Sequence, residues 1–382
     1  MVELGTLIHQ AKIVRCGEGD YPVLSMTMHD GLVFQNDKFN KTIASEDRSD
    51  YKVVNRNQLV ISFPIDEGVL AAQRIVDAGI VSPAYGIWDI NQELILPEFL
   101  EYALRCDRAL SYYKAKLRGS TARRRSLPTP TLLAYTVPLP DISEQEHILN
   151  VVHKTQKVIS GRTEEISLLD NLIKARFVEL FGGIHDSKMY PYKLVNDLTD
   201  VISGGTPSRD VNEYWEGGTI PWVKTTELQN NYVTKVEEYI TEEGLNNSSA
   251  KIVPAGTVLI AMYGQGKTRG MTAYLGIEAC TNQACACILP SDKINQTFLW
   301  QFFVLSYDNL RDRAKGGNQP NLNGNIIKNY PVLYPPIELQ EQFAAFVKQT
   351  DKSKVVEAIY KANTLFITLN GGNRYDVRTN EF

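Results

Sequence analysis

Cationic side chains gather in one short segment of the chain. Between positions 114 and 125 there are six Lys and Arg residues and no acid: Lys114, Lys116, Arg118, Arg123, Arg124 and Arg125. Gly119, Ser120 and Thr121 interrupt the run and favour a loop. Ammonium and guanidinium groups spaced along a loop suit contact with a phosphate backbone. An ordinary solvated loop is the alternative interpretation.

Amide side chains occupy the corresponding segment later in the chain. Downstream of Arg311 the cations give way to Asn318, Gln319 and Asn321. Asn and Gln donate and accept hydrogen bonds in pairs, which matches the major-groove edge of adenine. This segment therefore suggests base reading rather than phosphate contact, with a solvated loop again the alternative.

A third stretch has a phosphate-binding pattern of another kind. Ala261 to Thr268 follows an apolar run and fits the relaxed pattern A-x-x-x-x-G-K-T of nucleotide-binding loops. Such a loop must open a helix whose N-terminus binds the anion. The residues that follow, Arg269 to Gly276, look like a strand between two glycines. The sequence therefore favours a β-turn whose Gln265, Lys267 and Arg269 face DNA, and an ATP-dependent enzyme remains the alternative.

Catalytic and metal-binding patterns are not evident in the sequence. Tyr334-Pro-Pro-Ile337 has the prolines of an adenine methyltransferase loop without the polar residue before them or the aromatic residue after them. Five His residues stand without a nucleophile or metal spacing. Cys280, Cys285 and Cys287 have no His nearby and alternate as on a strand, so buried thiols are favoured over metal ligands. We expect neither a catalytic nor a metal site.

An internal repeat predicts the elements that hold these segments. Residues 135–148 align with 330–343 at an offset of 195, with six of fourteen positions identical, and upstream matches follow at an offset of 199. A period of this length makes each unit a whole domain. Each half begins with short apolar runs typical of β-strands and continues into a helix, the first from Pro97.

A long helix is predicted after each domain. Ser143-Glu-Gln-Glu146 reads as a capping box, and an apolar stripe runs from Ile148 to the stop at Gly182-Gly183. Ser143 to Phe181 would be roughly 58 Å long. A second, weaker stripe lies between Glu338 and Leu369. We expect the two helices to pair antiparallel; packing of each helix on its own domain is the alternative.

Composition limits the setting. The chain has 382 residues, 43% of them hydrophobic and 22% charged, enough for two ordinary cores. A net charge of −4 excludes a generally basic surface, so any contact with nucleic acid must be local. No run of about 18 apolar residues occurs and the first residues lack a signal-peptide pattern. We expect a cytoplasmic protein.

Two sets of motifs resemble the specificity subunit of type I restriction-modification systems. One is the doubled pattern around Val137-Pro-Leu-Pro-Asp-Ile-Ser-Glu-Gln145. The other lies in the second half and comprises Ile202-Ser-Gly-Gly-Thr-Pro-Ser208, Tyr214 to Trp222, Pro254 to Ile260 and Thr281-Asn-Gln-Ala284. The resemblance covers nearly the whole chain. Leu339-Gln340 departs from it where the first copy has Glu144-Gln145.

The resemblance implies an α+β fold and a domain order. Two mixed α/β target-recognition domains in a pseudo-twofold arrangement would be separated by two long antiparallel, coiled-coil-like helices. The expected bounds are 1–142 for the first domain, 143–181 for the first spacer helix, 182–336 for the second domain, 337–370 for the second spacer helix and 371–382 for a flexible tail.

The resemblance also implies a role, partners and sites. The chain would be a non-catalytic subunit that reads an asymmetric bipartite site in double-stranded DNA. It would dock two methyltransferase subunits and, through them, restriction/translocase subunits; S-adenosylmethionine, ATP and Mg would be used by those partners. Additional expected DNA contacts are Ser120, Thr206, Ser208, Arg209, Lys224 and Thr225. Expected partner contacts are Glu144, Gln145, Ile148, Val152, Ile159, Ile166, Leu169, Ile173, Gln340, Phe343, Ile359 and Phe366. A stand-alone DNA-binding regulator is the alternative function.

Overall fold

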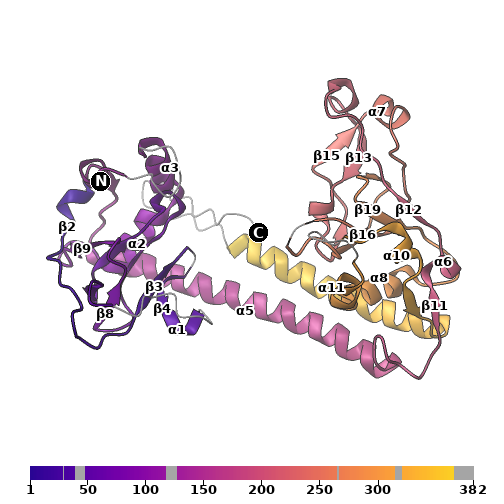
Figure 1. Cartoon of the computed structure of the whole chain (residues 1–382), viewed down its shortest axis with the longest axis horizontal. Coiled ribbons are helices and arrows are strands. Elements are labelled where there is room, and N and C mark those ends of the chain that lie inside the picture. Colours follow the sequence, from indigo (N-terminus) through magenta and orange to yellow (C-terminus); the bar gives the residue numbers. More distant parts are fainter. Residues whose placement is uncertain (29, 39–47, 118–126, 265, 315–320, 365–382) are drawn as a thin grey trace. The chain divides into compact units, whose positions relative to one another are not determined.

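The chain divides into two compact units. The structure, a computed structural model, describes residues 1–28, 30–38, 48–117, 127–264, 266–314 and 321–364 (Figure 1). Unit 1 comprises Met1–Gly161 and Tyr360–Phe382, and unit 2 comprises Arg162–Ile359. The predicted basic segment from Arg118 to Arg125 and the predicted tail 371–382 lie outside the described residues.

Unit 1 is built on a four-stranded antiparallel sheet with the order β2-β9-β6-β7. These strands are β2 (Ile8–Gln10), β9 (Gly86–Ile90), β6 (Leu59–Ile61) and β7 (Leu70–Ala72). Three two-stranded pairings accompany it: β1 (Val2–Glu3) with β10 (Thr136–Val137), β3 (Leu24–Thr27) with β4 (Gly31–Phe34), and β5 (Lys52–Asn55) with β8 (Ala78–Val81). The described helices of this unit are η1 (Leu4–Thr6), α1 (Gln35–Lys38), η2 (Ile65–Glu67), α2 (Pro97–Arg105), α3 (Asp107–Lys116), α4 (Thr129–Leu133) and the first part of α5 (Ile142–Phe181).

The strands of unit 1 bury both faces because their side chains alternate. Leu59 and Leu70 pack with Phe99 and Leu100 of α2 in one core. Val60 belongs to a second core on the other face. The sheet is therefore held between the helices and the β-ribbons.

Unit 2 repeats this plan with a larger main sheet of five strands. Its main sheet has the order β12-β19-β16-β17-β14, formed by β12 (Val201–Ser203), β19 (Cys285–Ile288), β16 (Val258–Ala261), β17 (Thr272–Leu275) and β14 (Asn231–Val233). A smaller sheet contains β15 (Glu238–Ile240), β13 (Ile220–Val223) and β18 (Cys280–Thr281), and β11 (Tyr192–Leu194) pairs with β20 (Pro331–Leu333). The described helices are α6 (Val195–Leu198), η4 (Asn212–Tyr214), η5 (Thr225–Glu227), α7 (Glu242–Asn246), α8 (Gln296–Leu305), α9 (Tyr307–Asp312), α10 (Gly324–Lys328), the last part of α5 and, up to residue 359, α11 (Ile337–Thr364).

The structural elements confirm the repeat and the mixed fold predicted from the sequence. At an offset of 199, β6 corresponds to β16, β9 to β19 and α2 to α8. At an offset of 195, α4 corresponds to α10, β10 to β20, and the start of α5 to the start of α11. The predicted helix from Pro97 begins there but breaks at Cys106 into α2 and α3.

Helix α5 contributes to both units. Leu149 packs in the core of unit 1, whereas Ile173, Phe177 and Phe181 pack in the core of unit 2. Gly182, with φ of 76°, ends the helix as expected. The start differs from the prediction: the backbone N–H of Glu144 donates to the Asp141 carboxylate at 2.8 Å, so Asp141, not Ser143, caps the helix.

The two long helices pack antiparallel within unit 2. The ring centroids of Phe181 and Phe343 lie 5.6 Å apart, and earlier in α5 the Arg176 guanidinium lies 5.9 Å from the Phe346 ring. Figure 1 shows α11 beside the end of α5. The antiparallel pairing is thus confirmed for these residues, and α11 also packs on its own domain through Phe343 and Val347.

Candidate nucleic-acid interface

Several loops meet at one edge of the main sheet of unit 2. Because neighbouring strands run antiparallel, β12 and β16 end where β19 and β17 begin. The Met262 N–H donates to the Ala284 carbonyl at 2.8 Å, and the Leu322 N–H donates to the Met262 carbonyl at 3.0 Å. Residues 204–206, 262–264, 266–271, 282–284 and 321–322 therefore lie along one edge of the sheet, called here the unit 2 edge.

The unit 2 edge contains four residues that the sequence predicts to contact DNA. Thr206 donates a hydrogen bond to the Gln283 side chain, Lys267 is exposed, and Arg269 and Asn321 are half-buried. The other predicted residues of these segments, Gln265, Asn318 and Gln319, lie outside the described residues. The hydrogen bond between Met262 and Leu322 thus joins the start of the segment that carries Lys267 and Arg269 to the segment that carries Asn321.

The glycines before Thr206 allow this close packing. A Cβ added to Gly204 would lie 2.2 Å from the Thr281 carbonyl oxygen, and one added to Gly205 would lie 2.2 Å from the Ser249 carbonyl carbon. Backbone atoms cannot move aside as a flexible side chain can, so residues with a Cβ are excluded at both positions. The Gly-Gly pair therefore places Thr206 against Gln283.

The loop from Met262 to Met271, called here the β16–β17 loop, is not a nucleotide-binding loop. Lys267 and Thr268 are followed by strand β17, which begins at Thr272. A phosphate-binding loop needs a helix at this point. The structure therefore overturns the ATP-dependent alternative and supports the turn expected from the sequence.

An exposed aromatic residue lies at this loop in each unit. In unit 2 Tyr263 stands two residues after β16 and is 41% exposed, and in unit 1 Phe63 stands two residues after β6 and is 50% exposed. Neither residue is among the DNA contacts predicted from the sequence. Their position after equivalent strands is the signal that could have identified them.

The corresponding loop of unit 1 packs on a helix. The turn η2, in the loop between β6 and β7, contacts α3. Lys114 and Lys116 are exposed on the last turn of α3, which leads to the predicted basic segment. Arg118, Ser120, Arg123, Arg124 and Arg125 themselves lie outside the described residues.

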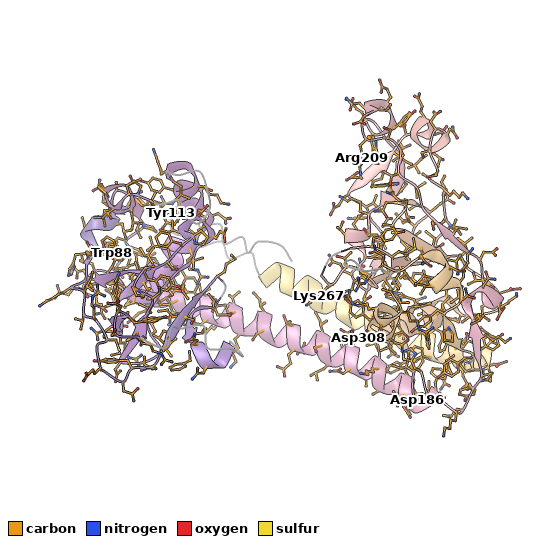
Figure 2. The ribbon with its side chains drawn as sticks, in the orientation of Figure 1. Trp88, Tyr113, Asp186, Arg209, Lys267 and Asp308 are labelled. Atoms are coloured by element: carbon orange, nitrogen blue, oxygen red, sulfur yellow. The ribbon has the colours of Figure 1, made fainter. Side chains whose placement is uncertain are left out.

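The remaining predicted DNA contacts of unit 2 lie near the small sheet. Arg209 and Lys224 converge on the carboxylate of Glu238, at 2.6 and 3.0 Å, and Lys224 also lies 2.6 Å from Glu237. Ser208 and Thr225 are next to these two cations in sequence. Figure 2 shows Arg209 and Lys267 on separate parts of unit 2.

The ion pairs near the small sheet change the charge available to a ligand. Hydrogen bonds to Glu237 and Glu238 raise the pKa of Lys224. Burial by itself would raise the pKa of Glu238, but its hydrogen bonds with Arg209 and Lys224 lower the pKa below its usual value. The Arg209 guanidinium also lies 3.6 Å from the Trp215 ring. Both cations thus stay charged and are paired with carboxylates of the protein, which the sequence did not indicate.

Two predicted partner contacts are structural glutamines. Gln145 and Gln340 are 0% and 1% exposed. The Gln145 amide donates to the carbonyls of Leu94 and Pro140, both at 2.9 Å, and its oxygen accepts from the Leu96 N–H at 2.8 Å. Gln340 repeats this, accepting from the Asn295 N–H at 2.9 Å and donating to the Pro335 carbonyl at 2.7 Å.

These contacts correct the prediction that the two glutamines bind a partner. Each ties the start of a long helix to the chain just before the preceding domain helix. Ile173 and Phe343, also predicted to contact a partner, are buried in the core of unit 2, so that prediction is corrected for them as well.

The other predicted partner contacts vary in accessibility. Glu144 is exposed, and the half-buried residues are Ile148, Val152, Ile159, Ile166 and Leu169. The side chain of Ile359 and the whole of Phe366 lie outside the described residues. Leu168 and Leu172, one turn apart on α5, are 60% and 49% exposed and were missed, because the predicted stripe ran along another face.

Cys280, Cys285 and Cys287 are buried on strands β18 and β19, as the sequence indicates. Burial raises the pKa of the Cys280 and Cys287 thiols to about 11, and raises that of Cys285 as well. Among the residues that the structure describes, no cluster of His, Cys, Asp or Glu could hold a metal ion. Within the same residues, no helix is long and apolar enough to cross a membrane.

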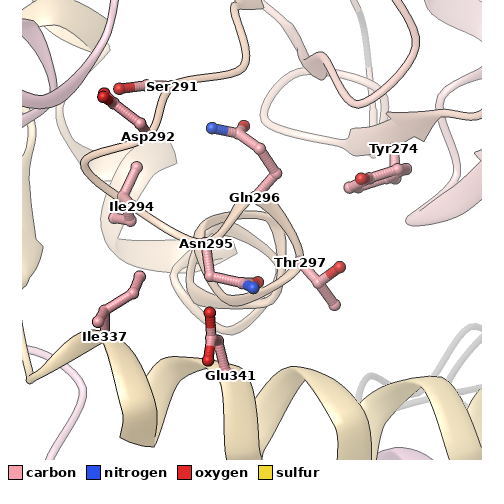
Figure 3. Close-up of a pocket in the computed structure, with 9 residues that line it drawn as sticks. All are labelled: Tyr274, Ser291, Asp292, Ile294, Asn295, Gln296, Thr297, Ile337 and Glu341. Atoms are coloured by element: carbon pink, nitrogen blue, oxygen red, sulfur yellow. The ribbon is translucent and has the colours of Figure 1, made fainter.

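A pocket of about 380 Å³ lies between the start of α8 and the start of α11 (Figure 3). Asp292 and Glu341 contribute carboxylates, and the nearby Ser291 hydroxyl donates to the Leu198 carbonyl at 2.7 Å. Ser291 is therefore engaged in holding the fold. The residues that line the pocket do not place a nucleophile beside a general base.

Comparisons with known proteins find similarity mainly in the second part of the chain. Residues 190–361 match the family model for the type I restriction modification DNA specificity domain. The MjaIX specificity subunit of Methanocaldococcus jannaschii is 31% identical over 172 residues, which are 43% of this chain and 38% of that protein. The EcoR124I/EcoR124II specificity subunit of Escherichia coli is 23% identical over 226 residues, 56% of this chain and 55% of that protein. The matches thus span about half or less of these relatives.

Solved structures support the fold over most of the chain. The S subunit of a type I restriction-modification system from M. genitalium has a TM-score of 0.56 at 14% identity, covering 95% of this chain and 92% of that one. A chain from a study of type I restriction-modification complex assembly has a TM-score of 0.54 at 17% identity, covering 95% and 93%. The resemblance to type I specificity subunits inferred from the sequence is confirmed.

Proposed function

We propose that the chain is the non-catalytic DNA-recognition subunit of a type I restriction-modification complex, in which units 1 and 2 each read one part of an asymmetric bipartite site. The proposal rests on the likeness to specificity subunits and on an arrangement of loop and helix that recurs within each unit. It assigns sequence reading to the sheet-edge loops.

The main support is one arrangement found in both units. In each, the loop after β6 or β16 has an exposed aromatic residue and packs on α3 or α9. Each of these helices leads into a segment whose sequence predicts nucleic-acid contact, basic in unit 1 and amide-rich in unit 2. A shared scaffold with different side chains suits two different base sequences.

Partner subunits supply the chemistry in this proposal. Methyltransferase subunits would dock on α5, where Leu168 and Leu172 expose apolar surface, and restriction/translocase subunits would join through them. S-adenosylmethionine, ATP and Mg²⁺ would be used by those partners. The names of the relatives, which are subunits of type I restriction enzymes, support this division.

Selection from a randomised duplex library tests the reading role. The purified chain, alone and with a candidate methyltransferase, should enrich two different words separated by an unread gap. A palindrome or a single word would contradict two-unit reading. Co-elution with the methyltransferase in gel filtration separates this function from that of a stand-alone DNA-binding regulator, which would enrich a site and elute alone.

A further inference from the structure

The side chain of Arg311, on α9, binds the backbone of the β16–β17 loop. One terminal nitrogen, Nη1, donates to the Arg269 carbonyl at 2.5 Å, and Nη2 donates to the Gly266 carbonyl at 2.9 Å. The Tyr307 hydroxyl accepts from Arg311 at 3.0 Å and donates to the Lys267 carbonyl at 2.7 Å. Two side chains of one helix thus bind three carbonyls around Lys267.

The loop needs such support because its own sequence is permissive. Gly264, Gly266 and Gly270 have φ of 137°, 60° and 86°, in the region that glycine enters freely. A loop with three such residues samples many conformations when it is not held. Ordering it only on binding would weaken the complex, whereas a loop ordered in advance avoids that loss.

The guanidinium of Arg311 is directed to the protein. Charge-assisted hydrogen bonds to carbonyls are stronger than neutral ones, and the planar fork of arginine suits two acceptors at once. Arg311, on α9, is half-buried, whereas Lys267, on the loop that Arg311 binds, is exposed. The geometry therefore separates a supporting cation from a cation that faces solvent.

We infer that Arg311 and Tyr307 are positioning residues for sequence reading by unit 2: they set the shape of the β16–β17 loop so that Tyr263 and Lys267 meet the DNA. This inference rests on the proposed function. It assigns α9 a supporting role rather than a place on the duplex.

The test compares Arg311→Ala, Arg311→Lys and Tyr307→Phe with the control Arg313→Ala. Arg313 is two residues away and lies 4.5 Å from the Tyr330 ring, so its loss removes the same charge from the same region. Binding of the full chain is measured by fluorescence anisotropy on the selected bipartite duplex and on duplexes with either word scrambled. Arg311→Ala should lower the affinity for the intact site about tenfold or more. It should abolish the preference for the unit 2 word and leave the preference for the unit 1 word unchanged. Arg311→Lys should restore part of it, because one ammonium cannot reproduce the fork.

A double-mutant cycle distinguishes positioning from other roles. Lys267→Ala should weaken DNA binding when it is introduced into the wild type and should have little further effect when it is added to Arg311→Ala. Deuterium exchange of residues 262–271 should be faster in Arg311→Ala than in the wild type. In the Lys267→Ala background, Arg311→Ala should leave the salt dependence unchanged. A further decrease in slope of about one would show that Arg311 itself contacts phosphate and would overturn the inference.

The remaining outcomes are also decisive. The positioning role alone is refuted if the wild type is sequence-selective and Arg311→Ala keeps its preference for the unit 2 word. The same holds if Arg311→Ala binds the duplexes with the same affinities as Arg313→Ala. A wild-type chain that binds all duplexes equally refutes the proposed function and the positioning role together.

Discussion

Replacing Glu238 with Gln should strengthen binding to DNA of any sequence. Glu238 bridges Arg209 and Lys224, and Lys224 keeps Glu237 as a second partner. The substitution therefore releases mainly the Arg209 guanidinium, which stays stacked on Trp215. If the small sheet lies near the duplex, a released cation becomes available to a phosphate.

The size of the effect follows from counterion release. One additional phosphate contact makes the slope of log K against log salt steeper by about 0.9. Between 200 and 50 mM salt, this slope corresponds to an extra gain in affinity of roughly 3.5-fold. Arg209 and Glu238 are partly exposed, so loss of the pair should change stability by only about 0–1 kcal/mol.

Anisotropy titrations on an unrelated duplex at four salt concentrations would measure the slope. Glu242→Gln is the matched control, because Glu242 is an exposed acid on α7 and its loss changes the net charge equally. Equal slopes for the two variants would refute the reasoning and place Arg209 away from phosphate. A flatter slope for Glu238→Gln would show that the ion pair instead holds Arg209 in its binding position.

Three other perturbations test separate parts of the structure. Changing Arg123–Arg125 to Ala should weaken binding to all duplexes alike and reduce the salt slope by about one per lost contact; an unchanged slope would mean that the run is only a solvated loop. Gln145→Ala should lower the free energy of unfolding by about 2–4 kcal/mol in urea titrations, because it leaves buried backbone groups unpaired. Gln340→Ala should do the same in the other unit. A loss below about 0.5 kcal/mol would contradict the role of these two glutamines, called here the glutamine clamps, in holding the helix starts. Phe63→Ala and Tyr263→Ala should each reduce preference for one word of the site with little change in melting temperature, since both rings are exposed; an equal effect on both words would argue against unit-specific reading.

The architecture was predictable because it depends on local patterns and on the repeat. Alternation of apolar residues places Leu59 and Val60 on opposite faces of a strand, and Pro97 starts a helix in the expected place. The stop at Gly182 follows from the need for a left-handed backbone. None of these features requires knowledge of distant contacts.

The site was only partly predictable because its key contacts join distant residues. Arg209 looked free in sequence, but its partner Glu238 is 29 residues away. Arg311 looked like the start of the amide-rich segment, yet it binds carbonyls more than 40 residues earlier in the chain. Gln145 looked like a surface residue of an amphipathic helix and is buried, because its amide meets groups about 50 residues upstream.

The internal repeat separates what supports the fold from what reads a ligand. Gln145 and Gln340 occupy equivalent positions, and Pro140 and Pro335 supply equivalent carbonyls to them. The edge loops follow a different rule: unit 1 has Phe63-Pro64 in a loop of eight residues, and unit 2 has Tyr263-Gly264 in a loop of ten.

Two copies of one fold within one chain have kept the residues that anchor the helices and changed those at the sheet edge. A scaffold role restrains a residue equally in both units, because both must bury the same helix start. Residues that read DNA must instead differ between the units when the two words of the DNA site differ. The edge loops are therefore where exchange of residues between the units should transfer sequence preference, whereas exchange of the glutamine clamps should leave it unaltered.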